Sequence, residues 1–290
     1  MNNPEIQFRD AMQVTLGPLD LLPVPDSNIH RFHVPGDKAG TVNGWYILHA
    51  DRIAVGVYGS WRAGGSQTWS SRQPADHLEA VLIRQRIEQA KHKREAEQYQ
   101  RNQAAAENAN RLWRDARCAD PQHPYLIAKG VMPHSLRQRG AVQLVPLYLN
   151  GELVNLQRIF PDGSKRFLRG GMVKGCYSPI GSIEPGRPLY ICEGWATGAT
   201  LYEETGAAVA CAMNANNLLE AGRRLQLRHP DALLIIAGDD DRQTEGNPGK
   251  TAASKAAAAL GSELIMPPWS GAEPLTCSDF NDLRQWRNAQ

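Results

Sequence analysis

Residues 233–260 read LLIIAGDDDRQTEGNPGKTAASKAAAAL, which is an apolar run, a polar loop and an alanine-rich segment that ends before Gly261. The apolar run predicts a buried strand and the alanine-rich segment predicts a helix. A strand, a loop ending in Gly-Lys-Thr and a helix are also the layout of a phosphate-binding P-loop. The stretch indicates an α/β fold and leaves open the role of its three consecutive aspartates.

The loop departs from a P-loop at its first position. Gly249, Lys250 and Thr251 match the end of the pattern G-x-x-x-x-G-K-[ST], but Thr244 stands where the first glycine belongs. Acids at the entrance would also oppose a bound phosphate, because a P-loop holds phosphate with backbone N–H groups and a lysine. We therefore interpret Gly-Lys-Thr as a helix start, with Lys250 exposed in its first turn.

Strands and helices alternate around this stretch. The expected strands are RPLYICEG (187–194), AAVACAM (207–213), ALLIIAG (232–238) and ELIMPP (263–268), and helices are expected at 196–206, 216–228 and 249–261. Such alternation predicts a parallel sheet that is flanked by helices, over residues 184–290.

Acidic residues follow two of the expected strands. Glu193 closes the first, and Asp239 and Asp241 follow the third on one side of an extended chain, with Asp240 pointing away. Ligands bind beyond the carboxyl ends of parallel strands, and clustered carboxylates repel one another unless a cation is present. Mg²⁺ or Mn²⁺ suits such oxygen ligands. The alternative is a solvated acidic loop that caps the next helix.

Two further acids, Asp279 and Asp282, lie in SDFNDL near the end of the sequence. They are candidate ligands of a second metal ion or outer partners of the first. Asp279 is equally typical of the residue that caps the start of a helix.

Three segments precede the sheet. Residues 1–75 alternate aromatic or β-branched residues with polar ones and predict a β-rich unit. Residues 76–117 contain no Gly or Pro and predict a long polar helix or arm without a sustained apolar face. Residues 118–183 predict a small α+β subdomain, in which Asn150-Gly151 is the turn of a hairpin.

The subdomain at 118–183 carries a run of cations with Asp162 as the single acid among them. The cations are Arg158, Lys165, Arg166, Arg169 and Lys174. Cations interleaved with aromatic residues are typical of a surface that binds nucleic-acid or nucleotide phosphates. The alternative is an ordinary hairpin with a solvated basic face.

Composition excludes several other classes. The five cysteines stand singly, which argues against a disulfide framework or a zinc site, and no apolar run is long enough for a membrane span. The first residues lack the apolar core of a signal peptide, so we expect a cytoplasmic protein without membrane contact. The net charge of +2 is uninformative about nucleic acid.

The phrases ICEGWATGATL, IIAGDDD and SDFNDL resemble the Toprim primases of phages and plasmids. HPYLIAKG and LVPLYLNGELVNLQRIFPDGSKRFLRGG resemble the basic subdomain that precedes Toprim in those enzymes, and residues 28–62 are similar to their N-terminal segment. The family's Cys/His zinc module and any helicase domain are not found. The resemblance therefore implies a minimal DNA primase core.

The resemblance implies metal-dependent synthesis of short RNA primers, with single-stranded DNA and ribonucleoside triphosphates as partners and a replicative helicase or other replication protein as a further one. Glu193 would act as general base or position the metal near the primer 3′-hydroxyl. Asp239 and Asp241 would hold Mg²⁺ or Mn²⁺ on the incoming triphosphate. Two alternatives remain: a Toprim nuclease with the same carboxylates, and a catalytically silent nucleic-acid-binding accessory of a mobile element.

Overall fold

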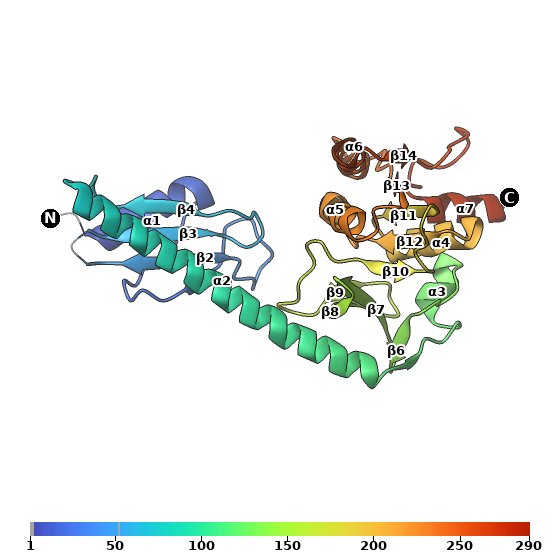
Figure 1. The fold of residues 1–290 in the computed structure, drawn as a ribbon, viewed down its shortest axis with the longest axis horizontal. Coiled ribbons are helices and arrows are strands. Elements are labelled where there is room, and N and C mark those ends of the chain that lie inside the picture. Colours follow the sequence, from blue (N-terminus) through green and yellow to red (C-terminus); the bar gives the residue numbers. More distant parts are fainter. Residues whose placement is uncertain (1–2, 52) are drawn as a thin grey trace. The chain divides into compact units, whose positions relative to one another are not determined.

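The structure is a computed structural model, and it describes residues 3–51 and 53–290. The chain forms two compact units, Met1–Gln100 and Arg101–Gln290, and Figure 1 shows the elements of each. Residues 1, 2 and 52, which belong to the segment predicted to be β-rich, lie outside the described residues.

The first unit is an antiparallel sheet with a helix on each face. Its strands pair in chain order and are β1 (His30–Phe32), β2 (Gly44–His49), β3 (Val55–Ser60) and β4 (Gln67–Ser70). On one face Tyr46 and Tyr58 pack against Phe8 of α1 (Pro4–Leu16). The sequence analysis did not predict α1, although Asn3 caps it by accepting the Glu5 N–H at 2.8 Å.

The long helix α2 (His77–Arg114) contributes residues to both units. In the first unit Ala90 is buried against Trp45 and Ile47 on the other sheet face. In the second unit Ala109 is buried beside Leu144. The helix thus uses alanines as core-facing residues, which is why its apolar positions seemed sparse when only large side chains were considered.

The second unit begins with a five-stranded antiparallel sheet in the order β5-β6-β7-β8-β9. Its elements are β5 (Arg117–Cys118), α3 (Pro124–Lys129), β6 (Arg137–Arg139), β7 (Val142–Leu149), β8 (Glu152–Ile159) and β9 (Lys165–Phe167). Asn150 and Gly151 both have positive φ, at 52° and 89°, as a type I′ turn requires. The hairpin predicted at this dipeptide is therefore confirmed.

A second five-stranded sheet follows, in the order β10-β12-β11-β13-β14. Its strands are β10 (Ser178–Ile180), β11 (Pro188–Cys192), β12 (Ala208–Cys211), β13 (Leu233–Ala237) and β14 (Glu263–Ile265). The last four run parallel, so the predicted parallel sheet is confirmed, whereas β10 is an antiparallel edge strand that was not foreseen.

Helices cover both faces of this parallel sheet (Figure 1). The helices α4 (Trp195–Thr205) and α7 (Phe280–Asn288) pack on one face, and α5 (Leu218–Arg228) and α6 (Pro248–Leu260) pack on the other. A short 3₁₀ turn, η1 (Ala215–Asn217), precedes α5. The α/β class predicted for residues 184–290 is confirmed.

The two sheets of the second unit share one core and a buried polar link. Val145 and Ile159 of the antiparallel sheet pack in the same cluster as Trp195 of α4. The buried side chain of Asn217 donates to the carbonyls of Val173 and Ala212 and accepts the N–H of Gly175 at 2.6 Å. These bonds connect the segment after β9 to the parallel sheet.

Across the described part of the chain, no helix has the length and apolarity for a bilayer crossing.

Candidate active site

Five carboxylates gather at the carboxyl end of the parallel sheet. Strands β11 and β13 are neighbours, with Cys192 opposite Ala237, so Glu193 and Asp239 leave adjacent strand ends. Burial raises the pKa of Asp239 to about 8, and four other carboxylates add to the rise: Asp279, Glu193, Asp241 and Asp282. All five acids named from the sequence therefore lie close enough to act on one carboxyl group, although among the described residues no three of them already form a ligand set.

One of these acids, Asp239, has a buried oxygen atom without a hydrogen bond: its Oδ1 atom has no partner among the described residues. Burial also raises the pKa of Glu193, as does the Asp241 charge, whereas the Ala215 N–H and the Lys165 ammonium oppose the rise. A cation between these groups would relieve both the repulsion and the missing contact.

Asp241 reaches the start of α6. Its Oδ2 atom accepts the Gly249 N–H at 2.8 Å, where the unpaired N–H groups of the helix favour a negative charge. A Cβ atom on Gly249 would lie 2.8 Å from the Asp239 carbonyl oxygen and 2.9 Å from Asp241 Oδ2. Gly249 is thus required for the close approach of the helix to both aspartates. Lys250 is exposed in the first turn, as predicted.

We expect Gly249→Ala to lower any metal-dependent activity by at least tenfold, because the added methyl group must displace Asp239 or Asp241. Lys250→Ala, the adjacent substitution, should keep most of the activity, and the wild-type protein should not hydrolyse ATP by itself. Turnover measured for both variants checks this. ATP hydrolysis by the wild type, with loss of activity in Lys250→Ala, would instead indicate a P-loop.

Asp279 and Asp282 are tied to α7 and its surroundings. Asp279 caps the helix by accepting the Asp282 N–H at 2.8 Å, and its other oxygen accepts from the Thr197 hydroxyl at 3.0 Å. Asp282 lies 3.4 Å from the Lys129 ammonium. The capping role that the sequence left open is therefore present, and it keeps Asp279 beside the other acids.

The predicted cations separate onto two faces of the β8–β9 pair. Arg158 and Arg166 are direct cross-strand partners, and both lie over Phe160. Lys165 projects to the opposite face, because successive strand residues alternate, and lies 5.3 Å from the Tyr125 ring. Lys165 lies near the carboxylates, since the charges of Asp279, Glu193 and Asp239 act on its pKa.

The pKa of Lys165 is affected by charges of both signs. Partial burial lowers the pKa of its ammonium group, and so does Lys129, whereas the charges of Asp279, Glu193 and Asp239 oppose the change. The side chain still retains solvent exposure. Arg169 and Lys174 follow β9 in exposed chain and have no described contact with the acids.

Sequence reasoning missed several residues that shape the site. Lys129, at the end of α3, pairs with Asp282, and the buried Asn281 donates to the Lys129 carbonyl at 2.7 Å. Asn247 accepts the Asp241 N–H at 2.9 Å and so sets the loop before α6. Lys129 and Asn281 lie in phrases already noted for their resemblance, HPYLIAKG and SDFNDL, but nothing local marks them as neighbours.

The acids fit a hard divalent cation by chemistry, since all are oxygen donors and one buried oxygen lacks a partner. Within the described residues, however, no three acid, histidine or cysteine side chains already converge as a ligand set. Several of the carboxylate oxygens are instead directed at helix N–H groups and at Thr197.

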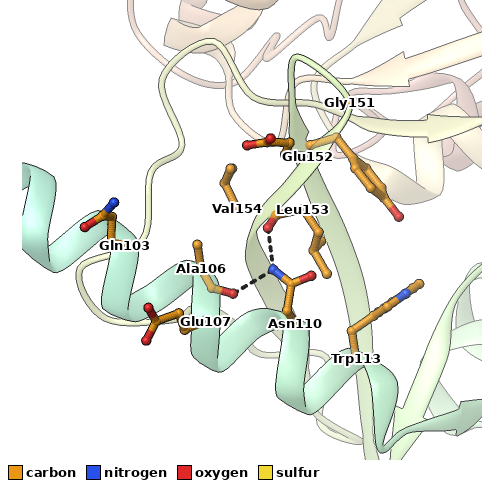
Figure 2. A pocket seen from close by; sticks show the side chains of 10 residues that line it. Gln103, Ala106, Glu107, Asn110, Trp113, Gly151, Glu152, Leu153 and Val154 are labelled. Carbon is orange, nitrogen blue, oxygen red and sulfur yellow. Dashed lines mark hydrogen bonds between the residues drawn. The ribbon is translucent and has the colours of Figure 1, made fainter.

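An open pocket of about 700 Å³ lies elsewhere in the second unit, between α2 and the β7–β8 turn (Figure 2). Trp113, Glu107 and Glu152 line it, and Asn110 spans its floor by donating to the Leu153 carbonyl at 2.9 Å. None of the five acids is among its lining residues, so it is distinct from the candidate site.

The chain is similar in sequence to known proteins. Residues 188–289 match the family model of the Toprim domain. Two Escherichia coli proteins named DNA primase TraC are each 33% identical to the chain, in alignments of 288 and 264 residues that cover 93% and 87% of it. The chain spans only 27% and 18% of their lengths.

A solved structure of the Aquifex aeolicus primase zinc-binding and RNA polymerase domains aligns with 99% of this chain and 85% of its own, at 14% identity and a TM-score of 0.39. That score carries no argument about function. The sequence matches are independent of it, and they cover both the acids and the basic subdomain. Residues 188–289 are therefore a Toprim domain, within a chain that is similar along most of its length to part of DNA primase TraC.

Proposed function

We propose that this chain is the catalytic core of a DNA primase, which synthesises short RNA primers on single-stranded DNA. The observation that carries the proposal is the gathering of five carboxylates at the carboxyl end of a Toprim sheet, with Lys165 of the adjoining sheet facing them. The similarity to proteins named DNA primase supports the same activity.

In this proposal Asp239 and Asp241 hold the divalent cation, and Asp279 and Asp282 hold a second ion or orient the first. Bound there, the cation would neutralise charge on the reacting phosphates. Glu193 accepts the proton of the primer 3′-hydroxyl or orients the attacking group. Its raised pKa, caused mainly by burial, favours the role of a base at neutral pH. We infer Mg²⁺ or Mn²⁺ as the ion.

The cations have different roles because they face different ways. Lys165 binds the phosphates of the incoming ribonucleoside triphosphate, since its ammonium group is acted on by the charges of Asp279, Glu193 and Asp239. We assign Arg158, Arg166, Arg169 and Lys174 to the template backbone, which a single strand presents as a row of phosphates. A replicative helicase or another replication protein in the cytoplasm would complete the set of partners.

We expect Lys165→Ala to raise the KM for ribonucleoside triphosphates about tenfold, which corresponds to one charged phosphate contact. The matched control is Arg166→Ala, because Arg166 is the next residue of β9 and projects to the opposite face of the sheet. This substitution should leave the KM for ribonucleoside triphosphates unchanged. Arg166→Ala should instead flatten the salt dependence of single-strand binding, with a log–log slope reduced by about 0.7. Equal effects of the two substitutions on KM would contradict the division of roles.

Incubation with single-stranded templates, ribonucleoside triphosphates and Mg²⁺ or Mn²⁺ tests the function directly. New oligonucleotides that depend on the template would support the primase proposal. Shortened substrate would indicate the nuclease alternative, and binding without either product would indicate an accessory protein. A template panel is needed because primases select their start sites.

A further inference from the structure

The loop between β14 and α7 is fastened to the middle residue of the aspartate triplet. The Asp240 Oδ2 atom accepts the indole N–H of Trp269 at 2.9 Å. The Asp240 backbone N–H donates to the carbonyl of Ser278 at 2.7 Å, one residue before Asp279. Asp240 is therefore hydrogen-bonded twice to the segment that leads to Asp279.

Arg242 strengthens this attachment from the other side. Its guanidinium group lies 4.1 Å from the centre of the Trp269 ring, and it donates to the carbonyls of Pro274 and Cys277 at 2.8 Å and 3.0 Å. A planar cation can stack on an indole and donate hydrogen bonds at its rim at the same time. One residue of the aspartate loop thus holds both ends of residues 269–277.

The held loop is itself well ordered by internal bonds. Glu273 is only 5% exposed, and its carboxylate accepts the backbone N–H groups of Ser270 and Gly271 at 2.9 Å and 3.0 Å. These bonds hold the pKa of Glu273 at about 2, well below its usual value. Because this turn is held by internal hydrogen bonds, a shift of Trp269 would also move the chain that leads to Asp279.

We propose that Asp240, Arg242 and Trp269 form a clasp that sets the spacing between the two acid-bearing segments, Asp239–Asp241 and Asp279–Asp282. The acids on these segments repel one another, so an attachment between the segments is needed to keep them close before a cation arrives. The three are positioning residues, because they act on the metal-binding acids without contacting the substrate. The inference rests on the proposed metal-dependent function.

The test is Trp269→Phe, which keeps an aromatic ring for Arg242 and removes the N–H that Asp240 accepts. Titrating Mg²⁺ should show that the variant needs about tenfold more metal for half of the metal-induced rise in melting temperature, as expected for loss of a hydrogen bond to a charged group. Primer synthesis should need the same excess, with a saturated rate within about twofold of wild type. The salt dependence of single-strand binding should not change.

Trp113→Phe is the matched control, because Trp113 packs beneath Arg137 in the antiparallel sheet and should not alter the metal requirement. A Trp269→Phe variant that melts at a lower temperature without metal but keeps the wild-type metal midpoint has lost only structure, and that result overturns the proposal. So does an unchanged variant. If the wild type makes no primers yet Trp269→Phe still shifts the melting midpoint, the clasp stands and the primase function fails.

Discussion

Glu193→Gln is expected to lower primer synthesis by about 10²–10⁴-fold, the usual contribution of a general base. The substitution keeps the shape of the side chain and its contact with the Ala215 N–H, but the amide cannot accept a proton at neutral pH. Single-strand binding should be unchanged, because that binding is assigned to cations of the antiparallel sheet. Primer yield and DNA affinity measured on the same preparation check both expectations.

The control for this substitution is Glu204→Gln, on the exposed surface near the end of α4, which should keep wild-type activity. Synthesis that survives in Glu193→Gln would remove Glu193 from the chemistry. A parallel loss of DNA binding would show that the residue acts through the fold or the template site instead.

Asp239→Asn is expected to remove most of the rise in melting temperature that Mg²⁺ or Mn²⁺ causes in the wild-type protein. A cation that binds only the folded state raises its stability by mass action, and Asp239 is the acid most strongly affected by the other four. Without metal, the variant should melt at a higher temperature than wild type. The wild-type protein must either bury the Asp239 charge or take up a proton at a carboxyl whose pKa is raised to about 8, and an asparagine side chain requires neither.

Thermal melting with and without millimolar metal measures both effects. Asp231→Asn, at the exposed turn before β13, is the control and should retain the wild-type response to metal. A wild-type melting curve that does not respond to metal would argue against a metal site among these carboxylates. Primer synthesis that continued in Asp239→Asn would argue against this residue as a ligand.

Much of the parallel sheet was predictable because its signals are local. Apolar runs that alternate with helical segments define β11, β13 and the helices around them. Glu193 directly follows β11, and Asp239 and Asp241 lie in the loop that follows β13. The turn at Asn150-Gly151 is equally local, because its positive φ values favour those two residue types. By contrast, α1 has a short apolar pattern, and its capping by Asn3 was overlooked.

Glu193 and Asp239 lie at one edge of the sheet because the structure makes β11 and β13 neighbouring parallel strands. Parallel strands present their carboxyl ends at one edge, so residues that end neighbouring strands must meet. The sequence left Asp279 open between a metal ligand and a helix cap, and it could not show that Lys129 pairs with Asp282, because Lys129 arrives from a segment distant in the chain. It also could not show that Gly249 is required by the close approach of α6 to Asp239 and Asp241.

By itself, the sequence determined the α/β class and which strands of the chain are followed by acids. Only the tertiary structure decided which cations face those acids: Lys165 does, and Arg166, its immediate neighbour, does not. Lys165 and Arg166 are adjacent cations and cannot be told apart by charge alone. In the structure, the alternation of side chains along β9 and its pairing register with β8 place them on opposite faces of the sheet. Local patterns reflect hydrogen bonding and periodicity over a few residues, but the meeting of distant side chains depends on how whole sheets pack.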